Sequence, residues 1–193
     1  MRNSRVLLVA LSLGVAMVVS QVAGEEKPKN LLVNGSFEDG PEPGGFLPLD
    51  KDAVDIKGWT VTRAQIDYIG THWKAADGKR SLDLHGSPGY GGIQQTFATT
   101  KGRKYKVSFA MAVNPNTSVE DAKVKKLGVA AAGKMESFSF DATGKTVEDM
   151  GWAMKTWEFT ADADKTTLEF YTLETTDPSC GPALDNVVVV EAK

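Results

Sequence analysis

The chain of 193 residues has few of the side chains on which metal-dependent and thiol chemistry usually depend. It contains one cysteine, Cys180, and two histidines, His72 and His85. A single cysteine excludes an internal disulfide, so the fold has to be held together by its core. The histidines share no metal-binding spacing, and a zinc site would need three or four ligands. The sequence therefore gives no support for a zinc site.

Long hydrophobic runs are scarce as well. The one such run, residues 6–19, follows Arg2 and Arg5 and precedes a stretch of small residues. About 14 apolar residues are too few for a bilayer span, which needs roughly 20. A positive start, a short apolar stretch and small residues are typical of a secretory signal. We therefore expect an exported protein, extracellular or at the cell surface, with the periplasm as a further option.

The organisation that follows from this signal is simple. We interpret residues 1–24 as a signal peptide, residues 25–29 as a polar lead-in and residues 30–193 as one domain. Cleavage after residue 24 would leave 20 basic against 25 acidic residues, with no basic patch of the kind that binds nucleic acid. Neither nucleic acid nor a membrane span in the mature chain is expected.

A helical hydrophobic period is missing throughout the chain. Short apolar alternations occur instead, separated by turn signals roughly every ten residues, which is typical of an all-β sandwich or jelly roll. Residues 41–52 and 87–92 are rich in Pro or Gly and are expected to be loops. The expected strands are residues 30–34, 57–62, 65–70, 81–86, 93–99, 104–113, 125–133, 136–144, 152–162, 165–174 and 183–192. The valine run in the last of these predicts a strand that is covered on both faces.

Two acidic residues are expected to meet where the chain closes. Glu38 follows the first predicted strand, and Asp185 begins the last one. If these strands pair antiparallel, both carboxylates lie at one corner. Calcium takes six to eight oxygen ligands, so we predict a structural Ca²⁺ held by Glu38 and Asp185. The alternative is that the carboxylates cap turn amides or pair with Lys79 or Arg80.

Aromatic side chains in loop-like stretches are the best candidates for ligand binding, because sugar rings stack on flat side chains. We name Trp73, Tyr90 and His72 as ligand-binding candidates and Arg80 as a weaker one. For Trp73 and Tyr90, plain packing is the alternative. Trp59 and Trp157 lie in strand-like stretches, and both are expected in the core.

Catalytic signals are weak. Cys180, in "DPSCGP", has no histidine beside it in the sequence to activate a thiol, so a structural thiol is favoured. Asp67 and Asp83 are expected on a concave face, but no pairing of carboxylates, as a glycosidase needs, follows from the sequence. We expect a chain that is not an enzyme, with a hydrolase as a remote alternative.

The order of several short motifs carries a family resemblance. The stretches "LLVNGSFEDG", "IKGWTV", "DGKRSLDLHG", "GGIQQTF" and "DPSCGPALDNV" occur in that order, and the last is the most specific. The chain resembles the bacterial choice-of-anchor C family and the plant cell-wall family called domain of unknown function 642. The resemblance implies a galactose-binding-like β-sandwich jelly roll, similar to many carbohydrate-binding modules. It also implies a calcium role for the residues that match here as Glu38 and Asp185.

The resemblance favours a secreted, non-catalytic binding module whose ligand is a polysaccharide or cell-surface glycan. The alternative is a structural component of the cell envelope or extracellular matrix, which binds another surface protein and no glycan. Plant members of the family have two tandem domains and a second cysteine, whereas this chain has room for one domain and holds Cys180 alone. A disulfide to Cys180 within the chain is therefore not expected.

Overall fold

The computed structural model describes residues 29–117, 123–177 and 179–192. The predicted signal peptide, residues 1–24, and most of the predicted lead-in lie outside the described residues. Every regular element in the described part is a β-strand. The twelve strands are β1 Phe46–Leu49, β2 Thr60–Arg63, β3 Ile66–Ile69, β4 Ser81–Asp83, β5 His85–Gly86, β6 Gly89–Ala98, β7 Lys104–Val113, β8 Val124–Ala131, β9 Lys134–Asp141, β10 Ala153–Thr160, β11 Lys165–Thr172 and β12 Pro182–Glu191.

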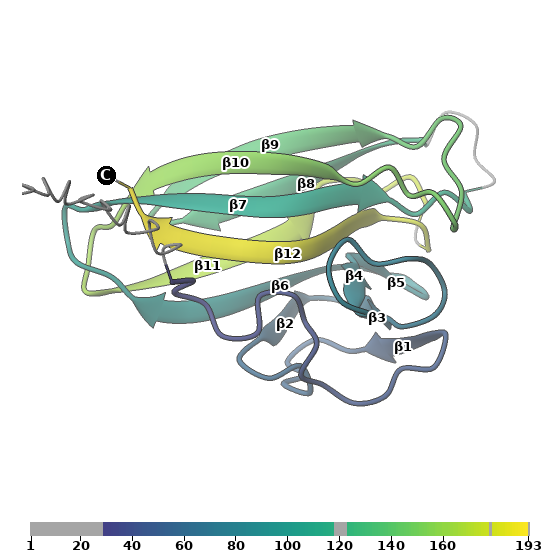
Figure 1. Ribbon diagram of the computed structural model, residues 1–193, viewed down its shortest axis with the longest axis horizontal. Helices are drawn as coiled ribbons and strands as arrows, with labels where there is room; N and C mark the ends of the chain where they lie inside the picture. Colours follow the sequence, from purple (N-terminus) through teal and green to yellow (C-terminus); the bar gives the residue numbers. More distant parts are fainter. Residues whose placement is uncertain (1–28, 118–122, 178, 193) are drawn as a thin grey trace, which may run out of the picture.

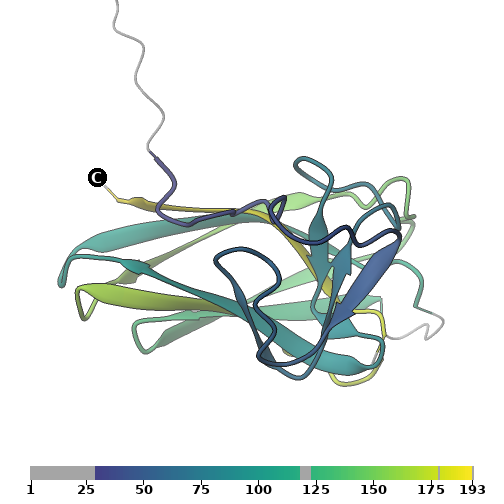
Figure 2. The same cartoon turned by 90° about the horizontal axis from the view of Figure 1, so that it is seen from below.

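The strands form two antiparallel sheets that lie one above the other (Figures 1 and 2). One sheet has the order β1-β3-β4-β12-β7-β10, and the other has the order β2-β6-β11-β8-β9, with β5 paired to β6. Strands that are distant in sequence are neighbours, as in β12 between β4 and β7. The prediction of an all-β sandwich of the jelly-roll type is confirmed.

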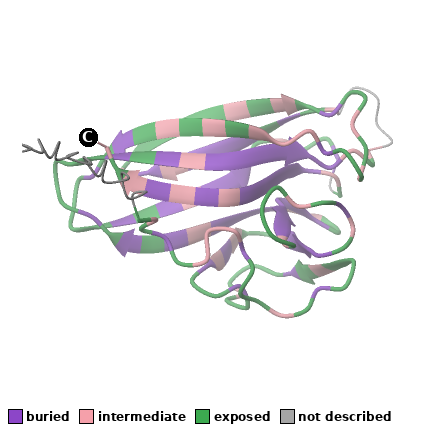
Figure 3. Ribbon diagram, in the orientation of Figure 1, coloured by how far each residue is buried: buried purple, intermediate pink, exposed green. Residues whose placement is uncertain are grey.

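The core lies between the sheets and follows the alternation in the sequence (Figure 3). Along β7, Tyr105, Val107, Phe109 and Met111 are all buried. The ring of Phe109 is fully buried, and truncating such a ring costs about 3–5 kcal/mol of stability. The valine run of β12 departs from the prediction, because residues 187 and 189 are buried whereas 188 and 190 are half-exposed. Only the first half of β12 is buried on both faces.

The first predicted strand, residues 30–34, is not a strand. It nevertheless lies antiparallel beside β12, with the Leu31 amide donating to the Val189 carbonyl and the Val187 amide donating to the Gly35 carbonyl. The side chain of Asn30 makes two further bonds to residues 187 and 189. A side-chain amide thus takes the place of backbone pairing, and this interrupts the regular ladder.

Two predicted loops contain strands. Residues 41–52 include β1, which pairs with β3 from Phe46↔Ile69 to Leu49↔Ile66. Residues 87–92 include the beginning of β6, which pairs with β5 and β2. In both places the Pro and Gly content suggested loops, whereas tertiary pairing decides the structure. The described residues contain no helix with the length and hydropathy needed to cross a membrane.

Candidate functional site

Glu38 and Asp185 both accept backbone amides of one loop, which corresponds to the amide-capping alternative of the sequence analysis; a calcium role for the two acids stays a prediction. Asp185 is fully buried, and its Oδ2 accepts the amides of Ala76 and Asp77 at 2.8 Å each. Glu38 Oε1 accepts two further amides of the loop, from residues 79 and 80, at 2.7 and 2.8 Å. Gly78 lies between them at φ +63°, and a Cβ there would collide with the Glu38 carboxylate. The two acids therefore hold the loop of residues 76–80 against β12.

The electrostatics of this corner centre on Asp185. Burial raises the pKa of its carboxyl to about 7, although three backbone amides donate to it and favour the charged form. No salt bridge to Asp185 is present in the described structure. The same residues also contain no group of three or more His, Cys, Asp and Glu side chains placed to hold a metal. A Ca²⁺ here would draw its other ligands from carbonyl groups and water.

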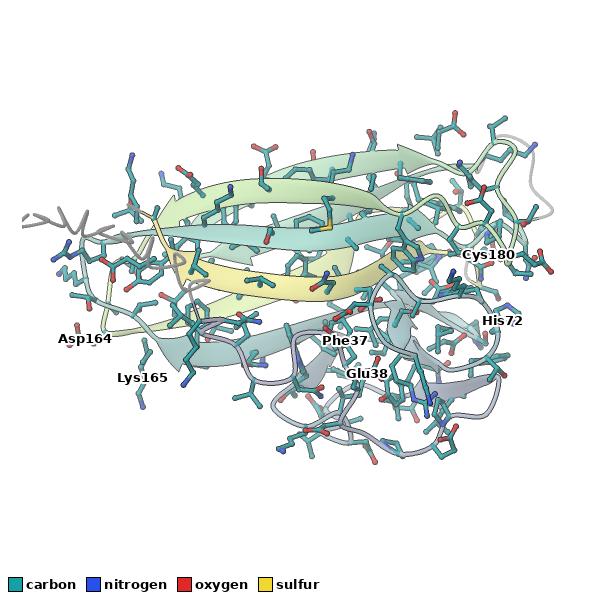
Figure 4. The ribbon with its side chains drawn as sticks, in the orientation of Figure 1. Phe37, Glu38, His72, Asp164, Lys165 and Cys180 are labelled. Carbon is teal, nitrogen blue, oxygen red and sulfur yellow. The ribbon has the colours of Figure 1, made fainter. Side chains whose placement is uncertain are left out.

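A second polar cluster lies at one end of the sandwich, which we call the loop end; His72 and Cys180 mark it in Figure 4. Strands β3 and β4 place Asp67 directly opposite Asp83 in the antiparallel register. Both side chains are buried, with 4% and 1% of their surface exposed. Residues opposite each other in such a pair have Cβ atoms roughly 5 Å apart. The sequence analysis expected Asp67 and Asp83 on a concave face without a deduced pairing, whereas the structure pairs their strands and buries both side chains.

Asp83 is fixed by three hydrogen-bond donors. Its Oδ1 accepts the amides of His85 and Gly181 at 2.9 and 3.0 Å, and its Oδ2 accepts Asn114 Nδ2 at 2.9 Å. These bonds join β4, the start of β12 and the end of β7. Burial outweighs them and raises the pKa of Asp83 to about 8. Both oxygens of Asp83 are thus engaged within the protein.

Asp67 is held on one side only. Ser87 Oγ donates to its Oδ2 at 2.7 Å, whereas its Oδ1 is buried and has no hydrogen-bond partner. Burial raises the pKa of this carboxyl to about 6. A pocket of about 160 Å³ lies against both acids. Because a buried acceptor without a partner is costly, Asp67 is the group at this end that is best suited to bind a ligand hydroxyl.

Ring side chains form one wall of this pocket. Phe46, at the start of β1, is 42% exposed, and its ring meets that of His72 edge to face at 5.7 Å. His72 Nε2 lies 3.1 Å from Asn116 Nδ2. The backbone N–H of Asn116 in turn donates to Asn114 Oδ1, so polar contacts run from the surface ring to the buried Asp83. An exposed ring edge thus borders polar groups, which is a common composition for small-ligand sites.

The predicted ligand residues do not all converge here. His72 lines the pocket. Trp73 is 4% exposed, and its Nε1 donates to Ser81 Oγ at 2.8 Å, so its ring is packed in the structure described. Tyr90 lies edge to face against His85, and its hydroxyl donates to a loop carbonyl at residue 175. For Trp73 and Tyr90 the packing alternative accounts for the contacts observed, and a direct role in binding stays a prediction.

Arg80, the weaker candidate, is placed elsewhere. Its Nη2 lies 2.6 Å from Glu42 Oε2, at the corner that contains Glu38. It does not line the loop-end pocket. Arg80 therefore contributes to the corner, and a role in ligand binding stays a prediction.

Cys180 lines the pocket without the features of a nucleophile. Burial, reinforced by the charges of Asp177 and Asp83, raises the pKa of the thiol to about 12. A thiol needs a lowered pKa or an adjacent base to react. The half-buried, unpaired thiol agrees with the structural role expected of it.

The interior beneath the loop end is unusually polar. His85 bonds Thr172 through Nε2 at 2.7 Å, and its Nδ1 has no partner. Burial lowers the pKa of this imidazole to about 4, so His85 is neutral near pH 7. Lys125, on β8, is fully buried and its Nζ is also unpartnered. With Asp67 Oδ1, these are the three buried side-chain atoms of the described structure that lack a partner.

Sequence reasoning missed Phe46, Ser87, Asn114 and Asn116 as site residues. The first lies within a Pro- and Gly-rich run, where a strand was not expected. Asn114 and Asn116 were part of a polar stretch with no distinguishing spacing. A signal for Asn114 existed in its position, because it directly follows the clearest strand, and in the structure its backbone amide donates to the Gly181 carbonyl just before the last strand.

Fold and motif order together define a single β-sandwich module of a known family. Residues 30–190 match the model of the family described as "Protein of unknown function (DUF642)". The chain belongs to this family, as the motif order predicted. The choice-of-anchor C resemblance stays a prediction.

Two relatives with similar sequences are longer than this chain. TEEBE of Arabidopsis thaliana is 32% identical over 182 residues, which cover 85% of this chain and 46% of TEEBE. Halomucin of Haloquadratum walsbyi (strain DSM 16790 / HBSQ001) is 31% identical over 193 residues, which cover 97% of this chain and 2% of halomucin. The chain thus spans about half of TEEBE and a small part of halomucin.

Solved structures with a similar sandwich include proteins that act on or bind carbohydrates. An arabinose-bound α-L-arabinofuranosidase matches 84% of this chain and 26% of its own, with a TM-score of 0.53 at 14% identity. The module TmCBM61, in complex with β-1,4-galactotriose, matches 85% of this chain and 99% of its own, with a TM-score of 0.49 at 15% identity. At such identities the likeness describes the fold and leaves function to the site.

Proposed function

We propose that this protein is an exported, non-catalytic module that binds a polysaccharide or cell-surface glycan at the loop end. The observation that carries the proposal is that the exposed Phe46–His72 ring edge and the acid Asp67, whose Oδ1 has no hydrogen-bond partner, line one pocket. A sugar presents an apolar ring face and hydroxyl donors, and these two groups complement them. The carbohydrate-binding folds named above agree with this ligand class.

The absence of catalysis is part of the proposal. Asp67 and Asp83 are the acid pair nearest to the pocket, but Asp83 accepts three internal hydrogen bonds on its two oxygens. A carboxylate fixed in this way lacks a free oxygen for an incoming substrate. The thiol of Cys180 is held protonated by its raised pKa. Neither Asp83 nor Cys180 is therefore available for catalysis in this pocket.

A structural Ca²⁺ at the corner of Glu38 and Asp185 is the finer part of the proposal. Its support is a fully buried carboxylate, Asp185, without a cation opposite it. Glu38 and Asp185 would supply oxygen ligands of the type that Ca²⁺ prefers. The ion would neutralise the buried charge and tie residues 36–38 to β12. The loop amides already bound to both acids hold the corner in the same way.

The test is retention on a panel of soluble and insoluble polysaccharides, with wild type beside Phe46→Ala and Asp67→Asn. Asp67→Asn keeps an acceptor for Ser87 and removes the carboxylate charge from the lining of the pocket. We expect each variant to bind roughly tenfold more weakly, the loss of about one good hydrogen bond or ring contact. Val54→Ala, at a side chain that is 68% exposed and outside the pocket, is the matched control.

The outcomes separate the functions considered. Unchanged affinity in both site variants would place the glycan elsewhere. Failure of the wild type to bind any glycan, with co-purification of a surface protein, would favour the structural component instead. Release of reducing sugar from the polysaccharides would show a hydrolase.

A further inference from the structure

Trp157, on β10, differs from the other tryptophans in its hydrogen bonding. The indole Nε1 atoms of Trp59, Trp73 and Trp152 each donate at 2.8–2.9 Å to Asn34 O, Ser81 Oγ and Lys74 O, respectively. Within the described residues, which include all four tryptophans, Trp157 Nε1 has no such partner. A tryptophan in a packed environment usually finds a partner for this group. The half-exposed Trp157 thus presents a free donor to solvent.

This ring borders a groove far from the loop end. The groove has a volume of about 420 Å³ and lies along the free edge of β10, where that strand ends and β9 begins. Figure 1 shows both of these strand ends in the half of the sandwich where the chain terminates, opposite the end that holds His72 and Cys180. The two surfaces share no lining residue.

The platform beneath the groove is rigid. Trp157 packs against Phe159 with ring centroids 5.6 Å apart, and Phe159 stacks on Tyr105 at the same distance. Phe159 and Tyr105 are buried core residues. A ring supported in this way loses little freedom when a ligand binds, which favours affinity.

The charge at the groove is positive. Lys104 and Lys134 line it from opposite sheets, and both are exposed. The one acid of the lining, Glu158, lies directly opposite Lys106 in the β10–β7 register. Two lysines against one acid leave the lining with a net positive charge that suits a ligand anion.

We propose that this groove is a second binding site and that it takes an acidic saccharide, a sugar chain carrying carboxylates. One sugar ring packs on Trp157, a ring oxygen or hydroxyl accepts from Nε1, and the carboxylate lies between Lys104 and Lys134. The inference rests on the proposed function only in taking a saccharide as the ligand, since it uses none of the loop-end residues.

The experiment compares trigalacturonate with its trimethyl ester, which has the same rings and no charge. Binding is followed by intrinsic tryptophan fluorescence and calorimetry in wild type, Trp157→Phe and the double variant Lys104→Gln/Lys134→Gln. We expect the ester to bind at least tenfold more weakly than the acid. The double variant should lose this preference and most of the salt dependence, because salt screens exposed charges. Trp157→Phe should bind about threefold more weakly and lose the fluorescence change.

Two controls keep the outcome interpretable. Lys51→Gln, at an exposed turn outside both sites, should leave binding unchanged. Phe46→Ala at the loop end should leave the trigalacturonate response at Trp157 intact. Equal affinity for acid and ester, no binding of the acid, or unchanged binding in both groove variants would each overturn the inference. If glycan binding is lost in the loop-end variants and in no groove variant, the inference fails and the proposed function stands. If the wild type binds no glycan at all, both fail.

Discussion

Asp67 and Asp83 lie directly opposite each other on β3 and β4, and both carboxyl groups are buried. They differ in their partners, since Asp83 accepts three hydrogen bonds and Asp67 accepts one. Burial raises the pKa of each, to about 8 and about 6, respectively. One end of the sandwich therefore combines a fixed acid with an acid that keeps a free oxygen.

The first prediction concerns pH. A carboxyl with a raised pKa in the folded state favours folding while it is protonated. The contribution of Asp67 is fully present below pH 3.8, its ordinary pKa, and is lost as the pH rises through about 6. The contributions of Asp185 and Asp83 are lost as the pH rises through about 7 and about 8, respectively. We expect the melting temperature to fall as the pH rises from 4 to 8.

Asp67→Asn is the matched variant for this prediction. It keeps the hydrogen bond to Ser87 and removes one titrating group. One pKa unit corresponds to about 1.4 kcal/mol. The free energy of unfolding of the variant, relative to that of wild type, should therefore be up to about 3 kcal/mol higher at pH 7 than at pH 4. Chemical denaturation at the two pH values measures this difference. A stability difference between variant and wild type that is independent of pH would show that Asp67 is charged at no cost in the folded protein.

A second prediction compares the two acids of the corner. Asp185→Ala leaves two loop amides and Asn186 N without their acceptor in a buried place, and should cost roughly 2–4 kcal/mol. Glu38→Ala also frees two amides, but Glu38 is exposed and water replaces it, so the cost should be about 1 kcal/mol. Urea denaturation of both variants gives the comparison. Equal costs would contradict the difference in burial.

A third prediction tests the proposed calcium ion at that corner. Calcium added to EDTA-treated protein should raise the melting temperature by several degrees, because an ion that binds only the folded state stabilises it. Magnesium should have little effect, since it prefers a small octahedral site. The rise should vanish in Asp185→Asn. No heat of binding and no thermal shift in the wild type would leave the loop amides as the sole partners of the two acids.

Much of the fold was readable from the sequence, and the reasons are local. The alternation in residues 104–113 and 165–174 predicted β7 and β11 because one face of each strand is buried against the other sheet. The position of residues 30–35 beside β12 followed from strand order alone, since the two ends of a closed sandwich lie side by side. Burial and pairing in space were less accessible. Phe46 was missed because its strand exists only through pairing with β3.

The tryptophans show where sequence reasoning reached its limit. Trp73, expected at a ligand site, is buried by residues that arrive from other parts of the chain, in a small cluster with Ile69, Met150 and others. Trp157, expected in the core, lies on the edge strand β10, where the sheet leaves its ring half-exposed. The local pattern of β10 gives no sign that it is an edge. Exposure at a sheet edge depends on strand order, which no short stretch encodes.

The last prediction concerns Lys125, whose side chain is fully buried on β8 with no partner for Nζ. Burying an unpaired charged group is costly, and replacing it by an apolar side chain of similar length is often stabilising. We expect Lys125→Met to raise the stability by roughly 1–3 kcal/mol, measured by urea denaturation. Lys126→Met, at the exposed neighbouring position, should change it by less than about 0.5 kcal/mol. A destabilised Lys125→Met would show that the ammonium group is paired in solution, with Asp177 as the acid within its electrostatic range.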